Sequence, residues 1–199
     1  MTQTGRAALE ALPLPCYTQQ RRNELLGLYP QLQKRIEQLN RQVDEVIEEH
    51  PQARRLLTHP GVGPVTALAT EVFLGDPRRF THGKAVASYI GMIPCEHSSG
   101  PRQRLGQLSK QGNALLRYLW CEAAMHAVNK DADLKRFYRR KLVQKGMGKA
   151  RVAAARKLGI RLWIMLRDQI DYEEFCRRRR QEGEAHAGMP DINSGPAVQ

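Results

Sequence analysis

A long helical period near the N-terminus is the feature that most constrains the fold of this chain. Hydrophobic residues recur there at steps of three and four: Leu25, Leu28, Leu32, Ile36, Leu39, Val43 and Val46. From Leu32 onward they follow the a/d alternation of a heptad repeat, with polar and charged residues between them. The pattern predicts one long helix over 19–49 with a coiled-coil seam through which the chain self-associates. The alternative is an amphipathic helix packed on its own domain.

Beyond Pro51 the sequence predicts further helices and no convincing strand pair. The expected helices cover 52–58, 64–73, 84–89, 113–127, 132–145, 148–167 and 172–181. Thr81 is expected to cap the third of these. Residues 92–112 contain five glycines and prolines, and they read as a loop of a length that is often functional.

These elements predict an all-α fold, with a long N-terminal coiled-coil helix followed by a compact helical domain. The expected organisation is the exit of an upstream domain over 1–18, the coiled-coil helix over 19–50, the helical domain over 51–181 and a disordered tail over 182–199.

The charge of the chain is concentrated in one segment. The 199 residues carry 32 Lys and Arg against 20 Asp and Glu, a net charge of +12. Residues 135–167 hold twelve of the cations and no carboxylate, so the remainder of the chain is balanced. A merely soluble basic protein is the alternative, but such a distribution favours a polyanionic partner, and DNA is the expected one.

The cysteines and the N-terminus indicate the compartment. Cys16, Cys95, Cys121 and Cys176 are scattered, without the spacing of a zinc site. No signal peptide and no apolar run of about 18 residues is found. We therefore expect a cytoplasmic bacterial protein with reduced thiols, associated with the nucleoid when it binds DNA, with no membrane contact and no metal or cofactor in this chain.

Two glycines between expected helices could bind a phosphate group. Gly61 and Gly63 lie in the stretch Pro60–Pro64, which resembles a helix-hairpin-helix turn. Backbone N–H groups at the start of the next helix would face the anion, and the helix dipole would favour its charge. A plain connection that needs glycine for its backbone angles is the alternative reading.

The loop over 92–112 holds two candidate nucleophiles, Ser98 and Ser99, directly before Gly100. Most Ser-Ser-Gly sequences are turns, and a serine needs activation before it attacks. Cys95 is a rival nucleophile, although a thiolate suits phosphodiester attack less well.

Several cations surround this loop in sequence. Those placed to converge on one anionic group are Arg102, Arg104, Lys110 and Arg117. Lys149 and Arg156 lie on a helix whose small residues suit close packing against the helix that follows Asn113, which leaves its cations for a nucleic-acid backbone. A solvated basic face is the alternative for both groups. Trp120 and Trp163 are expected in the core.

Taken together, the motifs resemble a known family. They are Leu57-x-x-Pro60-Gly61-Val62-Gly63-Pro64, Tyr89-Ile90-Gly91-Met92-Ile93-Pro94, Ser98-Ser99-Gly100, Lys110-x-Gly112-Asn113-x-x-Leu116-Arg117 and Ala153-x-Ala155-Arg156-Lys157-Leu158. In this order they resemble the C-terminal domain of bacterial insertion-sequence transposases of the IS110/IS116/IS902 family, over about residues 56–167.

The resemblance implies a chemistry. Such domains supply a serine nucleophile that forms a covalent DNA intermediate, and the enzymes are oligomers guided by a structured RNA. The matching residue is Ser99, with Ser98 as the alternative, and Lys110 and Arg117 would contact a nucleic-acid backbone. The family's acidic resolvase-like domain, the expected place of Mg²⁺, has no counterpart in this sequence.

Two other functions stay open on the sequence. One is a catalytically inactive DNA- or RNA-binding remnant, or a regulator of a full-length transposase. The other is a coiled-coil assembly protein whose basic face binds a different partner.

Overall fold

The computed structural model describes residues 2–96 and 105–187. The chain divides into two compact units, Met1–Val46 and Ile47–Gln199. Helix α2 (Cys16–Glu49) belongs mainly to the first unit, and its last residues begin the second. The long helix expected over 19–49 is therefore present, three residues longer at its N-terminal end.

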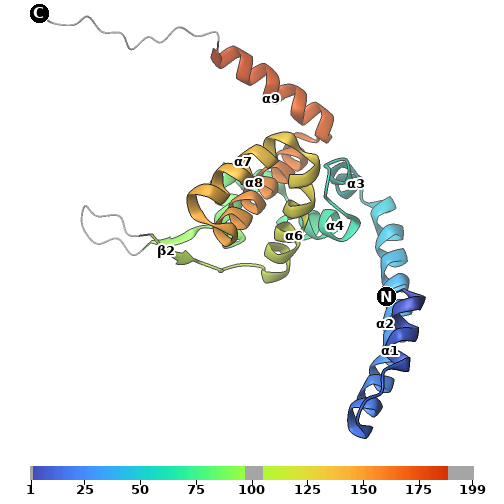
Figure 1. The fold of residues 1–199 in the computed structure, drawn as a ribbon. Coiled ribbons are helices and arrows are strands. Elements are labelled where there is room, and N and C mark those ends of the chain that lie inside the picture. Colours follow the sequence, from blue (N-terminus) through green and yellow to red (C-terminus); the bar gives the residue numbers. More distant parts are fainter. Residues whose placement is uncertain (1, 97–104, 188–199) are drawn as a thin grey trace, which may run out of the picture. The chain divides into compact units, whose positions relative to one another are not determined.

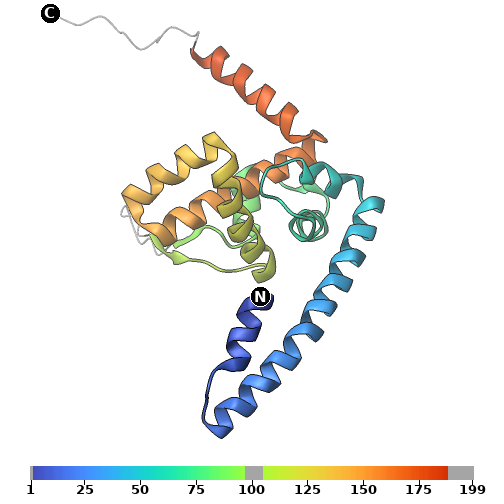
Figure 2. The ribbon, with the colours of Figure 1, turned by 45° about the vertical axis from the view of Figure 1, so that its right-hand side comes forward.

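The first unit consists of α1 (Gln3–Ala11) and most of α2, joined by a turn that reverses the chain (Figure 2). Arg22 on α2 donates hydrogen bonds to the carbonyls of Leu9 and Leu12, at 3.1 and 2.9 Å, and so fixes the end of α1. Leu32, Ile36 and Leu39 are each about half exposed. The seam predicted from the sequence is thus uncovered in the single chain.

The second unit is built from helices, with one short hairpin at its edge (Figure 1). Its elements are α3 (Pro51–Leu57), α4 (Pro64–Leu74), the 3₁₀ turn η1 (Pro77–Arg79), α5 (Gly83–Tyr89), β1 (Pro94–Glu96), β2 (Leu105–Leu108), α6 (Ala114–Lys130), α7 (Ala132–Lys145), α8 (Met147–Asp168) and α9 (Tyr172–Ala187). The all-α fold class is confirmed, since the two strands form the only sheet in the described part of the chain.

Helix α8 is the centre of this unit, because it contacts α3, α4, α5, α6, α7 and η1. Small residues on α8 allow the neighbouring elements to pack close to its backbone. A Cβ at Gly159 would lie 2.0 Å from the ring of Trp120, which is fully buried and donates to Thr70 Oγ1 at 3.0 Å. Trp163 is also buried and donates to the Pro77 carbonyl at 2.8 Å. Both tryptophans are core residues, as expected, and α8 packs on α6 as its small residues predict.

Three local expectations are corrected. Residues 92–112 are not wholly loop, because β1 and β2 pair antiparallel with Pro94 opposite Leu108 and an irregularity before Glu96. His82, not Thr81, caps α5, and its Nδ1 accepts from the Ala85 N–H at 3.0 Å. The expected tail begins inside α9, which extends to Ala187; the rest of it, 188–199, lies outside the described residues.

Within the described ranges, none of the helices has both the length and the apolar composition needed to cross a bilayer.

Candidate nucleic-acid interface

A groove of about 1260 Å³ crosses the second unit along α8. Its walls come from α7, α8, the hairpin and the start of α9. Among the described residues that line it, one is a carboxylate, Asp168, and nine are cationic. The cationic residues are Lys141, Lys145, Lys149, Arg156, Lys157, Arg161, Arg167, Arg178 and Arg179. Apolar side chains such as Ile164 and Phe175 form much of the remaining wall.

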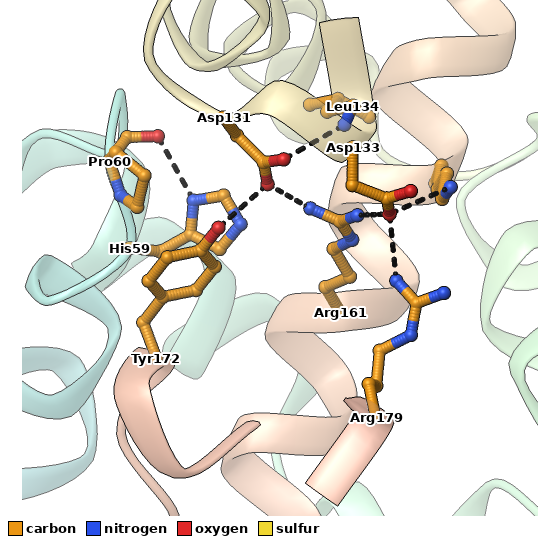
Figure 3. Close-up of polar contacts among 9 residues, drawn as sticks. His59, Pro60, Asp131, Asp133, Leu134, Arg161, Tyr172 and Arg179 are labelled. Atoms are coloured by element: carbon orange, nitrogen blue, oxygen red, sulfur yellow. Dashed lines mark hydrogen bonds and ion pairs between the residues drawn. The ribbon is translucent and has the colours of Figure 1, made fainter. Parts of the chain in front are cut away.

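Two carboxylates at the start of α7 neutralise one part of this groove (Figure 3). Asp131 caps α7 by accepting from the Leu134 N–H at 2.8 Å, and it pairs with Arg161. Asp133 pairs with Arg161, with Lys157 at 3.2 Å and with Arg179 at 2.9 Å. Hydrogen bonds from these cations lower the pKa of Asp133 to about 2 despite its partial burial, which raises it.

Arg161 is therefore a structural residue. Its side chain is 5% exposed and bridges α8 to the start of α7. Arg161 belongs to the basic segment over 135–167, but its charge is taken up by two carboxylates and does not face a polyanionic partner. A buried guanidinium is stable only with partners, and Asp131 and Asp133 provide them.

A second set of groove cations has no ion pair with any described residue. They are Lys141, Lys145 and Lys149, around the turn between α7 and α8, and Arg156, two turns along α8. Lys141 makes a long hydrogen bond to Gln144, at 3.4 Å, and its Nζ lies 5.8 Å from the centroid of the Phe137 ring. Because these charges are not neutralised, this part of the groove carries most of its positive potential.

The two glycines of the expected phosphate turn have different surroundings. Gly61 has φ +88°, and a Cβ there would lie 2.4 Å from the backbone nitrogen of Ala127. Gly61 thus serves the close approach of its turn to α6. Gly63 directly precedes α4 as its N-cap residue, no side chain caps the helix there, and a Cβ at Gly63 would meet no atom within 4 Å. Only Gly63 is open to a ligand among the two.

Lys110 and Arg117 lie near the base of the hairpin. Arg117 donates from Nη1 to the carbonyls of Ile90 and Gly112, at 3.0 and 3.1 Å, so part of its guanidinium holds the backbone together. Lys110 is exposed, with φ +55°, and its backbone N–H donates to Gly91 at 3.1 Å. Neither residue lines the groove, whereas Lys149 and Arg156 do.

The candidates Ser98, Ser99, Arg102 and Arg104 lie outside the described residues. The described strands on either side of them border the groove through Pro94, Gly106, Gln107 and Leu108. Cys95, the rival nucleophile, is half-buried in β1.

Sequence reasoning counted Lys141 and Lys145 in the basic segment without singling them out, and it missed Phe137; all three lie on α7 and line the groove. Their spacing of four residues places them on one face of a helix, which is the signal that could have identified them.

His59 joins the turn after α3 to this cluster (Figure 3). It is 1% exposed, its Nδ1 lies 3.0 Å from the Pro60 carbonyl, and its ring lies 4.4 Å from that of Tyr172. Tyr172 in turn donates to Asp131 at 2.8 Å. Burial lowers the pKa of His59 to about 4, so the ring is neutral at pH 7 and Nδ1–H donates to Pro60.

A helical unit with a cationic groove has the character of a nucleic-acid-binding domain. Residues 53–139 match the sequence profile of the Transposase IS116/IS110/IS902 family. A protein of Pseudomonas aeruginosa named "Probable family 20 transposase" is 33% identical over 185 residues, covering 86% of this chain and 55% of that protein. The transposase for insertion sequence element IS1111A of Coxiella burnetii is 32% identical, covering 75% of this chain and 46% of that protein.

The chain carries the C-terminal transposase domain of the IS116/IS110/IS902 family. It spans about half the length of these two relatives.

In the described ranges, no three His, Cys, Asp or Glu side chains gather in a way that could hold a metal ion. We therefore assign no step to the Mg²⁺ that the family resemblance implies.

We predict that His59 makes folding stability depend on pH. The unfolded ring takes up its proton near pH 6.5, whereas the folded ring does so only near pH 4. The unfolded state therefore binds more protons between these values, and stability falls by about 2 kcal/mol from pH 7.5 to pH 5. Urea unfolding at the two pH values should show this loss in the parent and much less of it in His59→Asn. His126→Asn, at an exposed position on α6, is the control; equal losses in all three proteins would contradict the prediction.

Proposed function

We propose that this chain acts in DNA transposition, with the groove binding the DNA backbone and Ser99 attacking a phosphodiester. The observation that carries the proposal is the set of unpaired cations Lys141, Lys145, Lys149 and Arg156 beside the hairpin. The names of the relatives, both transposases, support the same reading.

The dimensions of the cation set suit a nucleic-acid strand. Lys149 and Arg156 are seven residues apart on α8, which corresponds to about 10 Å along the helix axis. Phosphates of one DNA strand advance about 3.4 Å each along the duplex axis. The distance between Lys149 and Arg156 therefore corresponds to about three phosphate-to-phosphate steps. Gly63, before the uncapped start of α4, offers a separate backbone contact.

The hairpin supports a role for Ser99. Ser99 follows Glu96, the end of β1, by three residues, so the chain limits the distance between their Cα atoms to about 11 Å. Because β1 and β2 border the groove, a nucleic-acid strand bound there would pass beside both ends of the segment that contains Ser99. Arg102, Arg104, Lys110 and Arg117 would then hold the attacked phosphate.

The proposed reaction is a transesterification. The Ser99 Oγ attacks phosphorus, a Ser-O–P bond forms, one P–O bond of the strand breaks, and the released sugar oxygen takes up the proton that the serine loses. Ser98 is the alternative nucleophile. A second DNA hydroxyl would reverse the step and transfer the strand.

The phosphates of an RNA strand would make the same contacts, so we include a structured guide RNA among the proposed partners. We also propose that the chain is associated with the nucleoid when it binds DNA. The rival function is a binding remnant or regulator without catalysis. A binding remnant would make the same groove contacts with nucleic acid but would need no serine nucleophile. Trapping of a covalent intermediate therefore distinguishes the transposase from the binding remnant.

We also propose that α2 assembles copies of the chain. The half-exposed Leu32, Ile36 and Leu39 form a continuous apolar row, which a second α2 would cover. Replacing Leu32 and Leu39 with Glu should lower the sedimentation coefficient to that of a monomer. Gln33→Glu with Gln38→Glu, at polar positions of the same helix, is the control of equal charge and should leave assembly intact. An unchanged coefficient in the leucine variant would remove the seam from consideration.

The groove cations predict a specific salt dependence. Each neutralised phosphate contributes about 0.9 to the slope of log K against log salt for duplex DNA. Lys149→Gln with Arg156→Gln should therefore reduce the slope by about 2 in fluorescence anisotropy titrations. Arg136→Gln with Arg139→Gln removes the same charge from exposed α7 positions that do not line the groove, and should leave the slope in place. Equal slopes for the two variants would refute the groove assignment.

The nucleophile is tested by trapping the covalent intermediate. Incubation with labelled insertion-sequence ends and denaturing electrophoresis should show a protein–DNA adduct that Ser99→Ala abolishes, because no hydroxyl remains to form the bond. Ser98→Ala and Cys95→Ser are matched controls in the same segment and should retain the adduct. An adduct lost only in Ser98→Ala transfers the role to that residue. The parent chain is also tested in the presence of the upstream half of a relative. If it then binds DNA but forms no adduct, the result favours the binding remnant.

A further inference from the structure

The groove is divided into two parts of different chemistry along α8. Lys149, Val152 and Arg156 line its first part, together with the unpaired lysines of α7. Ile160, Ile164 and Arg167 line the second part, which continues into the start of α9. At 1.5 Å per residue, Ile164 lies about 12 Å beyond Arg156 along the axis.

Every cation of the second part already has a carboxylate partner. Lys157, Arg161 and Arg179 pair with Asp133. Arg167 pairs with Asp168 at 2.6 Å, and Arg178 with Glu174 at 2.8 Å. A phosphate entering here would meet these carboxylates and would have to displace them. The second part therefore does not favour further negative charge, although it is rich in arginine.

The walls of the second part are instead apolar. They comprise Met92, Ile160, Ile164, Ile170 and Phe175. Ile164 is partly exposed, as is Ile160 one turn earlier on the same face of α8, so this face presents apolar surface to the groove. Such a surface, with hydrogen-bonding groups at its edge, fits a flat and uncharged ring system.

Phe137 lies where the two parts meet. Its ring is partly exposed and lies beneath Lys157, with Nζ 4.6 Å from the ring centroid. An aromatic side chain between free cations and an apolar wall is the combination on which single-stranded nucleic acids stack their bases.

We propose that the groove holds an unpaired segment of a polynucleotide, with its phosphates on Lys141, Lys145, Lys149 and Arg156 and a base in the apolar part beside Ile164. This inference rests on the phosphate contacts of the proposed function. It adds that the bound nucleic acid is single-stranded. A base inside an intact duplex is stacked and paired, and it cannot reach a protein wall beside its own phosphate.

The experiment compares strands that share phosphates and differ in bases. The full chain is titrated with a labelled DNA strand of about twelve nucleotides, with the same strand in which every base is replaced by an abasic site, with the RNA of the same sequence, and with the DNA duplex. We expect the intact single strands to bind about tenfold tighter than the abasic strand, because the bases contribute through stacking and apolar contact. A preference between the DNA and RNA strands identifies the natural source.

A substitution at Ile164 tests whether the base contact lies in the second part of the groove. Ile164→Ser removes apolar surface from the second part and should weaken binding of the intact strand about fivefold to tenfold, with no effect on the abasic strand. Val143→Ser, on α7 and 89% exposed, does not line the groove and is the control. Thermal unfolding of both variants verifies that they are folded, and the abasic comparison on the parent chain does not depend on them.

Two results overturn the inference and differ from failure of the proposed function. Equal binding of intact and abasic strands, or tighter binding of duplex than of either intact strand, excludes a base in the groove even if the salt slope still depends on Lys149 and Arg156. Loss of that salt dependence refutes the proposed function itself.

Discussion

The pairing of Asp131 and Asp133 with Arg161 is the interaction on which the second unit depends. Arg161 lies in the middle of α8, where an unpaired guanidinium would be very costly to bury. The two carboxylates at the first turn of α7 are also favoured by the dipole of that helix. One cluster thus fixes the corner between α6 and α7 to α8, and through Tyr172 and Arg179 it fixes the start of α9.

The same cluster divides the charge of the groove. Asp133 alone is in contact with three cations, and Asp168 and Glu174 neutralise two more. What remains unpaired is gathered around the turn between α7 and α8. The fold therefore converts a uniformly basic segment of sequence into a surface with one charged part and one neutral part, and this division underlies both the phosphate contacts and the base contact that we propose.

Much of the helical framework could be predicted from the sequence, because its signals are local. Asn113 caps α6 through a bond to the Leu116 N–H, Pro64 begins α4, and Gly146 separates α7 from α8. The hairpin could not be predicted in this way. Its strands are three and four residues long, too short for an alternating pattern, and their pairing is a contact between segments separated by a Gly- and Pro-containing stretch. The His82 cap was missed because threonine is the usual capping residue and an imidazole nitrogen is not.

The site was predicted only in part, and the reason is tertiary. Arg156 and Arg161 are both arginines of one basic helix, five residues apart and so about 140° apart around its axis. Asp131 and Asp133 reach only one of these faces, which leaves Arg156 free and buries Arg161. The sequence of the helix alone does not predict which of the two arginines pairs with the carboxylates. Lys149 and Arg156 were identified from their helix, whereas Lys141 and Lys145 gain their role from the turn that brings α7 beside α8.

The base of the hairpin is held together by two very close backbone contacts. A Cβ at Gly91 would lie 1.8 Å from the Gln111 carbonyl oxygen, and one at Gly112 would lie 2.1 Å from that of Tyr89. Both glycines have positive φ, so no other residue suits either position. Arg117 binds two carbonyls at the same crossing. The two backbones are therefore held together directly below β1 and β2, at a place that glycine contacts and a guanidinium make rigid. For the reaction that we propose, an anchored base would help to position the attacking oxygen against a bound phosphate, and such positioning provides a large share of the rate in transesterification.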